Sequence, residues 1–199
     1  NRNRVLELDM GEVILFLDSD LVKISDNIVE HLTKIFTDKK IAIAGGQILE
    51  KGRPMIFSYG VGPFLPIDNS WLLSWIRPIT RLSSKIYQHK VPIKPIDITW
   101  TAEGVMAIRS SVFKQLGGFD TNFELYHEGP DLCVRTRKLG YRVIYDPCLK
   151  FEHLHIQHIS KKDNINRSTA YWFYKHCNWP KWLANFMFLY HGRDIDEIL

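Results

Sequence analysis

The sequence of 199 residues contains no apolar run that approaches the roughly 20 residues needed to cross a bilayer as a helix. It is also poor in cysteine, because it has only Cys133, Cys148 and Cys177, scattered along the chain. Their spacing is neither that of a disulfide framework nor that of a metal site. These absences predict a protein that does not span a membrane and that works in a reducing compartment such as the cytoplasm.

The sequence also lacks a strong excess of charge of either sign. Its 26 Lys and Arg residues against 22 Asp and Glu residues give a net charge of +4 and an isoelectric point near 8.9. This balance is compatible with a phosphate-bearing small molecule or an anionic membrane surface, and it is too weak to indicate a nucleic-acid partner. Apolar residues make up 45% of the chain, which predicts a single globular domain with one substantial core, with or without an appendage.

An apolar stretch, Val13–Leu17, runs directly into two carboxylates, Asp18 and Asp20. Such a run is typical of a strand covered on both faces, as in a parallel sheet. Side chains at its carboxyl end lie where open α/β sheets hold their ligands. Two acids this close repel each other unless a positive group lies between them, and a divalent cation is the usual group. The alternative is that Ser19 and Asp20 only begin a loop.

The remaining chain shows further strand and helix patterns. Strands are predicted at 40–50, 104–109, 141–147 and 149–155, and helices at 26–38, 110–118 and 129–141. Ser25 is expected to cap the first of these helices, and Asp146-Pro147 to close the strand at 141–147. Residues 51–99 carry six prolines interleaved with aromatic residues, which is typical of a long excursion over a scaffold.

The order of these elements suggests that the sequence does not start at the beginning of a domain. A parallel α/β sheet normally builds its first strands before the strand that binds the ligand. Here the chain begins with Asn1, and its first strong element already ends in acids. We therefore expect an amino-terminal part to precede it.

Four segments together resemble the catalytic half of an inverting family 2 glycosyltransferase, of the kind that includes rhamnosyltransferase-like enzymes of cell-envelope glycans. They are "NRNRVLELDMGEVILFLDSD", "TAEGVMAIRSSVFKQLGGFDTNF", "HEGPDLCVRTRKLGYRVIYDP" and "FEHLH". The resemblance implies an α/β fold of the GT-A class, a Rossmann-like mixed sheet flanked by helices. It also implies a nucleoside-diphosphate sugar as donor and Mg²⁺ or Mn²⁺ as cofactor. Residues 1–158 would be the catalytic part, and residues 159–199 a basic, aromatic helical extension.

The resemblance gives roles to the acids after the first strand. Transfer from a nucleoside diphosphate develops charge on the leaving group, and a hard cation with oxygen ligands stabilises that charge. Asp20, farthest out on the strand end, is the expected metal ligand. His153 matches a histidine that completes the metal shell in related enzymes. Asp18 is expected to contact the donor's ribose or a metal-bound water, with capping of the following turn as its alternative.

Inversion in one displacement needs a general base on the acceptor hydroxyl. Similar enzymes place this base in an E-D-x-D segment at the start of a helix. Here the segment reads Glu128-Gly129-Pro130-Asp131, so glycine stands where the second acid is due. Either Glu128 takes over as the base, or Asp131 does, or activity is impaired. Glu128 is preferred, because Asp131 in the first helical turn also has a structural use at the helix dipole.

The "GGFD" segment is a signal for the acceptor side. Gly118 allows a tight turn, so that Phe119 and Asp120 approach the cleft, although a helix stop with a capping Asp explains the same pattern. His155 and His158 suggest a zinc site together with His153, but no Cys or acid accompanies them at a structural-zinc spacing. A partly exposed histidine is therefore the expectation at both positions.

The aromatic, basic segment after Ser160 has two interpretations. It packs a helix back on the domain, or it lies in a membrane interface and makes a peripheral contact on the cytoplasmic face. The second fits an acceptor that is a glycan or is lipid-linked.

Two other functions remain open from the sequence. Val13–Val22 also fits the opening signature of haloacid-dehalogenase-like phosphatases, in which the first Asp is a nucleophile. That class needs a further acidic pair at a late strand end, which "YRVIYDP" does not supply. A non-catalytic relative, a sugar-binding module that keeps the fold, is the other alternative, and Gly129 favours it.

Overall fold

The computed structural model describes residues 2–8, 11–55, 58–66, 91–154 and 162–189. The chain divides into two compact units, each described here by itself. The first consists of 1–64, 88–120 and 128–157, and the second of 65–87, 121–127 and 158–199. None of the helices in the described ranges is long and apolar enough to cross a membrane.

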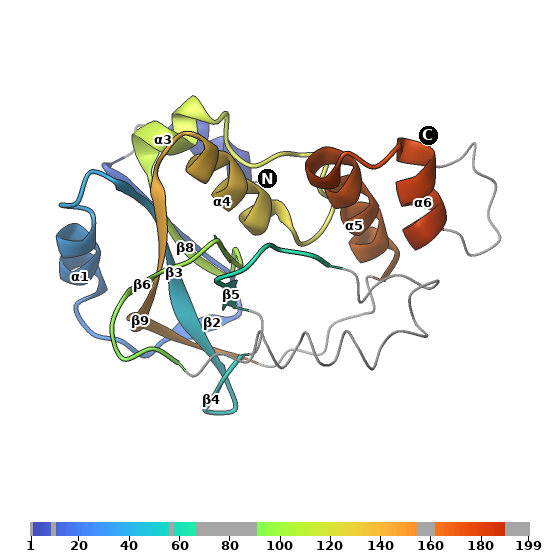
Figure 1. Ribbon diagram of the computed structural model, residues 1–199. Coiled ribbons are helices and arrows are strands. Elements are labelled where there is room, and N and C mark those ends of the chain that lie inside the picture. The colour runs from blue at the N-terminus through green and yellow to red at the C-terminus, as the bar shows by residue number, and fades with distance from the viewer. Residues whose placement is uncertain (1, 9–10, 56–57, 67–90, 155–161, 190–199) are drawn as a thin grey trace. The chain divides into compact units, whose positions relative to one another are not determined.

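The first unit is a mixed α/β structure, as the sequence predicts. Its helices are η1 (Arg2–Glu7, a 3-10 helix), α1 (Ile28–Ile35), α3 (Ser110–Gln115) and α4 (Glu128–Lys138). Its strands are β1 (Val13–Leu17), β2 (Leu21–Lys23), β3 (Ile41–Glu50), β4 (Arg53–Pro54), β5 (Tyr59–Gly60), β6 (Ile96–Asp97), β7 (Trp100–Thr101), β8 (Val105–Arg109) and β9 (Arg142–His153). Figure 1 shows β3 and β9 as the two long central strands.

The main sheet has the strand order β1-β8-β3-β9-β2, with β4 added to β3 and β6 added to β9, while β5 and β7 pair separately. Only β3 and β9 run parallel, and every other described pair is antiparallel. The expectation for β1 is therefore wrong in two respects. β1 pairs antiparallel with β8, and because it ends the strand order it is only half-buried.

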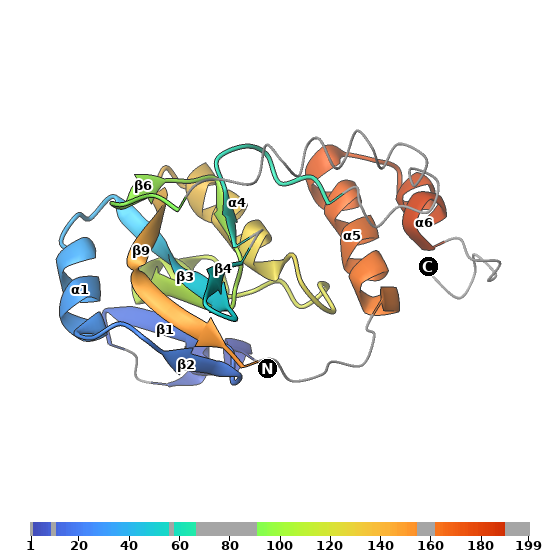
Figure 2. The ribbon, with the colours of Figure 1, turned by 90° about the horizontal axis from the view of Figure 1, so that it is seen from below.

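Helices cover both faces of this sheet. On one face Leu32 and Phe36 pack on Ala44, Ala107 and neighbouring apolar side chains. On the other face Phe16 of β1 packs against Phe113 and Phe119, with ring centroids 5.3 and 5.0 Å away. Figures 1 and 2 both show β3 and β9 between α1 and α4. The core lies in β3, β8 and β9, whose apolar side chains are almost all buried.

Two local predictions are wrong for an identifiable reason. Ser25 does not cap α1, which starts at Ile28 after Asn27 in a left-handed conformation. The Ser25 hydroxyl instead donates to the Cys148 carbonyl and accepts from the Lys150 amide. The predicted strands at 141–147 and 149–155 form one strand, β9, whose pairing with β3 shifts register after Asp146. The Asp146 carboxylate accepts from the Cys148 amide at 2.9 Å, so the residues expected to end a strand form a bulge inside it.

The second unit contains α5 (Lys162–Cys177) and α6 (Lys181–Leu189). Aromatic residues join these helices, because Phe173 stacks on Phe188 with centroids 5.1 Å apart and lies 4.6 Å from Trp179. Trp172, Phe173 and Phe188 are buried. Trp182, at 65% exposed, and Phe186 remain accessible on α6. The central part of the proline-rich excursion, residues 70–87, lies outside the described residues, as do His155 and His158.

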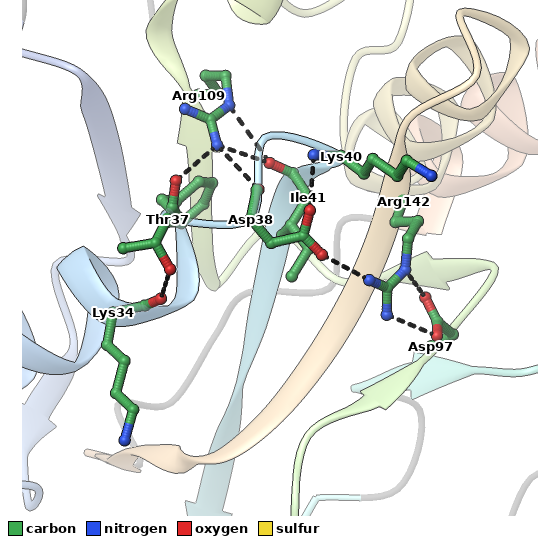
Figure 3. Close-up of polar contacts among 9 residues, drawn as sticks. Lys34, Thr37, Asp38, Lys40, Ile41, Asp97, Arg109 and Arg142 are labelled. Atoms are coloured by element: carbon green, nitrogen blue, oxygen red, sulfur yellow. Dashed lines mark hydrogen bonds and ion pairs between the residues drawn. The ribbon is translucent and has the colours of Figure 1, made fainter.

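A buried arginine forms hydrogen bonds to the backbone of the connection between α1 and β3. Arg109, at the end of β8, donates to the carbonyl oxygens of Phe36, Asp38 and Ile41 over distances of 2.9–3.3 Å. Arg142 lies nearby and pairs with Asp38 and Asp97 at 2.8 Å, but its side chain is 42% exposed. Figure 3 shows both guanidinium groups around this connection.

We expect Arg109→Met to lower the free energy of unfolding by about 2–4 kcal/mol, because three carbonyl oxygens lose their buried donor. The matched control Arg142→Met removes exposed ion pairs and should cost no more than about 1 kcal/mol. Urea unfolding followed by circular dichroism measures both. Equal losses in the two variants would show that the buried contacts of Arg109 do not stabilise this connection.

Candidate functional site

The two acids of the "DSD" segment lie in the short link between β1 and β2. The Asp18 amide donates to the Gly104 carbonyl at 3.0 Å, and the Leu21 amide donates to the Asp18 carbonyl at 3.3 Å. β1 and β2 stand at opposite ends of the described strand order, yet three residues connect them. The link therefore crosses one end of the sheet, with its backbone held at both sides.

Asp20 and His153 form a close pair. Leu21 is the register partner of His153, and the Leu154 amide donates to the Asp20 carbonyl at 2.7 Å. As a result Asp20 Oδ2 lies 3.2 Å from His153 Nε2, and both side chains are mostly buried, at 13% and 20% exposed. Two ligands about 2.1 Å from one octahedral cation lie about 3 Å apart. The pair therefore has a spacing that suits two ligands of a single divalent cation.

Arg2 was not among the residues predicted from the sequence, yet it connects two that were. Its Nη2 lies 2.8 Å from Asp18 Oδ1, and its Nη1 lies 3.0 Å from Glu128 Oε1. The guanidinium also lies over the Phe119 ring, 5.7 Å from its centroid. One cation from η1 thus brings the acid after β1 and the acid at the start of α4 to the same place.

Glu128 begins α4 and is 17% exposed. Its Oε1 is paired with Arg2, but its Oε2 is buried and has no hydrogen-bond partner within the described part of the chain. Burial is the main cause that raises the pKa of Glu128, and the charge of Asp18 raises it further. Glu128 is thus a carboxyl group whose proton affinity is increased and whose second oxygen lacks a donor.

Glu103 is a second acid that the sequence analysis missed. It lies in the turn between β7 and β8 and is only 7% exposed. Burial, and then repulsion from Glu128, raise the pKa of Glu103 to about 7. A lone Glu in "TAEG" gives no signal in the sequence, because its importance depends on what the fold places beside it.

Asp131 is fully buried and has a structural role. Its Oδ2 accepts from Arg135 Nε at 2.7 Å. The same guanidinium donates to the carbonyl oxygens of Leu116 and Gly118 at 3.0 and 2.8 Å. Asp131 therefore orients an arginine that ties α4 to the turn after α3. Of the two acids considered as the base, Glu128 is the more exposed and the one beside Asp18.

The "GGFD" turn is anchored by η1. Gly118 has a φ of 82°, and a Cβ there would lie 2.5 Å from Asn3 Oδ1. The Asn3 side chain accepts from the Phe119 amide at 2.8 Å and donates to the Phe119 carbonyl at 2.7 Å. Phe119 is buried beneath Arg2, whereas Asp120 is half-buried. The turn thereby fixes the helix from which Arg2 reaches the two acids.

A separate group of metal-ligand side chains lies at the bulge of β9. Donor atoms of His31, Asp146 and Cys148 fall within 4.8 Å of one another. His31 Nε2 already contacts Asp146 Oδ2 at 2.5 Å. None of the residues predicted for the site belongs to this group.

No protein-family model matches the chain, but individual relatives do. Over 157 residues it is 26% identical to the rhamnosyltransferase WbbL of Escherichia coli (strain K12), an alignment that covers 79% of this chain and 57% of that protein. Over 111 residues it is 27% identical to the N-acetylglucosaminyl-diphospho-decaprenol L-rhamnosyltransferase of Mycobacterium tuberculosis (strain ATCC 25618 / H37Rv), which covers 56% of this chain and 32% of that protein. The chain thus matches about half or less of the length of these relatives.

Two solved structures show the same fold. The crystal structure of GalNAc-T7 with UDP, GalNAc and Mn²⁺ matches with a TM-score of 0.54 at 14% identity, covering 85% of this chain and 32% of that one. A mycobacterial protein matches with a TM-score of 0.50 at 16% identity, covering 90% of this chain and 51% of that one. These findings confirm the predicted α/β fold of the GT-A class and the resemblance to family 2 glycosyltransferases.

The raised pKa of Glu103 predicts a pH-dependent stability. Because the folded chain binds this proton more tightly, with a pKa of about 7 against an ordinary value of 4.5, its contribution to stability is fully present below pH 4.5. It is lost as the pH rises through 7. As the pH rises from 4.5 to above 7, we expect the free energy of unfolding of Glu103→Gln to increase by roughly 3 kcal/mol relative to that of the wild type.

Unfolding of both proteins in urea at pH 4.5 and pH 8 measures this difference. Burial lowers the pKa of His127 to about 4, which makes stability fall toward acid pH, but this effect is common to both proteins and cancels. A difference that does not change with pH would mean that Glu103 titrates normally.

Proposed function

We propose that this chain, as a relative of the rhamnosyltransferases, transfers a sugar from a nucleoside-diphosphate sugar to an acceptor hydroxyl group, with inversion at the anomeric carbon. One observation carries the proposal. The guanidinium of Arg2 contacts both Asp18 and Glu128, so the acid assigned to the donor and the acid assigned as the base lie on either side of one small cation. A single displacement needs these two functions at the same reacting centre.

On the donor side, Asp20 and His153 would hold a divalent cation, Mg²⁺ or Mn²⁺. Their separation of 3.2 Å suits two ligands of one ion, and a carboxylate ligand such as Asp20 suits Mg²⁺ or Mn²⁺. When bound, such a cation supplies a Lewis acid that offsets the charge of the departing diphosphate. Asp18, with its side chain 41% exposed, is left to orient the donor's ribose or a metal-bound water.

On the acceptor side, the Glu128 carboxylate would take the proton of the attacking hydroxyl. The acceptor oxygen then forms its bond to the anomeric carbon while the bond to the diphosphate oxygen breaks, and the electron pair leaves with the nucleoside diphosphate. Burial supports this role because it raises the pKa of Glu128, and a stronger base accepts the proton more readily. Gly118, Phe119 and Asp120 are proposed to border the acceptor.

The relatives suggest finer assignments within this reaction. Their names specify rhamnosyl transfer, in one case to N-acetylglucosaminyl-diphospho-decaprenol, so we propose L-rhamnose as the donor sugar and a glycan or lipid-linked acceptor. Trp182 and Phe186, exposed and one turn apart on α6, would make a peripheral membrane contact near such an acceptor. Residues 1–158 would provide the catalytic part, and residues 159–199 the extension that makes this contact.

We expect Asp20→Ala to lower the release of nucleoside diphosphate from nucleoside-diphosphate-L-rhamnose about a hundredfold or more, because a ligand of the proposed cation is lost. Chelation with EDTA should have the same effect in the wild type, and Mn²⁺ or Mg²⁺ should reverse it. The control Asp26→Ala changes an exposed acid that pairs only loosely with Lys23, at 3.8 Å, and should leave the rate unchanged.

Two outcomes would replace the proposed function. Cleavage of p-nitrophenyl phosphate that depends on Asp18 would favour the phosphatase interpretation. Binding of the nucleotide sugar, measured by calorimetry, without any release of nucleoside diphosphate would favour a non-catalytic sugar-binding module.

The assignment of the base makes a separate prediction. Glu128→Gln should lower the turnover number by about 10²–10⁴ while donor binding is retained, because the proton acceptor is removed and its shape is kept. Asp131→Asn should act mainly on stability, because it weakens the buried ion pair with Arg135. Turnover and thermal melting of both variants test this division. A Glu128→Gln variant with wild-type turnover would contradict it.

A further inference from the structure

The start of α4 is packed so closely that a side chain at position 129 would collide first with the carboxyl group of Glu103. A Cβ atom on Gly129 would lie 2.6 Å from Glu103 Oε2, 2.9 Å from the Glu103 amide nitrogen and 3.0 Å from the Thr101 carbonyl oxygen. The first of these contacts is informative. The space beside Gly129 already holds a carboxyl group, and that group belongs to a different segment of the chain.

The segment that carries Glu103 is held firmly in this position. The Ala102 amide donates to the Ser58 carbonyl at 2.9 Å, and the Thr101 hydroxyl donates to the same oxygen at 3.0 Å. On the other side of Glu103, the Gly104 carbonyl accepts from the Asp18 amide at 3.0 Å. Because both neighbours are hydrogen-bonded, the backbone of Glu103 is held in place.

Glu103 and Glu128 then share one environment. Both are buried or nearly so, and Arg2 is the cation that faces the pair. Arg2 binds Glu128 through Oε1, which favours the ionised form of Glu128, while Glu128 Oε2 has no donor within the described residues. Two ionised carboxylates cannot donate a hydrogen bond to each other, but a protonated Glu103 can donate one to Glu128.

We propose, on the premise of the transferase function above, that Glu103 supplies the second carboxyl group that related enzymes carry at position 129. It acts through Glu128 as a positioning residue. Glu103 stays protonated and donates a hydrogen bond to the Glu128 carboxylate. This hydrogen bond keeps Glu128 ionised and fixes the orientation of its carboxylate. In the transfer step the proton of the acceptor hydroxyl goes to Glu128, and Glu103 retains its own.

The charges that face Glu103 are consistent with this division. Glu128 and Asp18 favour its protonated form, and Arg2 opposes it, while the Cys133 thiol on α4 stays neutral because burial raises its pKa to about 12. Below its pKa of about 7 Glu103 holds a proton, and because it is the more deeply buried member we assign the proton of the pair to it.

The decisive experiment moves the acid from position 103 to position 129 in the full chain. Glu103→Gly should lower the turnover number at least about tenfold with an unchanged KM for nucleoside-diphosphate-L-rhamnose, since Asp18 and Asp20 are intact. Adding Gly129→Asp to Glu103→Gly restores the family's arrangement and should recover most of that loss. The matched control, Glu103→Gly with Gly129→Ala, places the same Cβ without a carboxyl group and should recover nothing.

Thermal melting of each variant controls for folding, because the Cβ at position 129 in both double variants would lie 2.9 Å from the amide nitrogen of residue 103 and 3.0 Å from the Thr101 carbonyl oxygen. The variant Glu103→Gln keeps the shape of the side chain and removes its acidity. It should lose the ionisation near pH 7 from the pH profile of the turnover number. Wild-type turnover and pH profile in Glu103→Gln, or equal turnover in the two double variants, would overturn the proposal.

A measurement that does not depend on catalytic activity distinguishes this inference from the proposed function. Carboxyl ¹³C resonances of glutamate, followed by NMR, should show that Glu103→Gln shifts the titration of Glu128, and that Glu128→Gln lowers the pKa of Glu103. Independent titrations would refute the pair whatever the activity is. If the wild type releases no nucleoside diphosphate from any donor but the titrations are coupled, the transferase function fails and the carboxyl pair stands.

Discussion

The site depends on the close approach of the segment Trp100–Val105 to glycines of β3 and α4. A Cβ on Gly45 or Gly46 of β3 would collide with Thr101 or Val105, and one on Gly129 would collide with Glu103. These contacts fix where β8 begins, and the Gly104 carbonyl in turn fixes the Asp18 amide. The positions of the donor-side acid and of the acids near α4 therefore depend on close packing at these glycine positions.

Charge balance within the site comes from the chain itself. The sequence raised the question of what lies between two neighbouring acids, and the structure gives each its own partner, Arg2 for Asp18 and His153 for Asp20. Glu103 and Glu128 together face the guanidinium of Arg2. Burial is the main cause that raises the pKa of both glutamates, and repulsion from neighbouring acids adds to it.

Local patterns were enough to predict β3, β8, α3, α4 and the acids at the end of β1, since each is a short run with a clear period or stop. Ser25 and Asp146 were misjudged because their side chains bond to residues more than a hundred positions away, or within a bulge, and no local pattern reports that. Arg2 and Glu103 were missed for the same reason. Gly129 did carry a signal, because a glycine in place of an expected acid marks a position where another group has taken the space.

The link between β1 and β2 has only three residues, and the distance between the two strands limits how its acids can be spaced. Four steps between strands of a flat sheet span about 19 Å, whereas the four peptide units from Leu17 to Leu21 reach at most about 14 Å. The sheet must therefore curve enough to bring its two edge strands within reach of the link. An inserted residue would slip β2 by one place along β9, which turns alternate side chains to the opposite face and separates Asp20 from His153. The curvature of the sheet therefore constrains the length of this link, in addition to any constraint from a bound ligand.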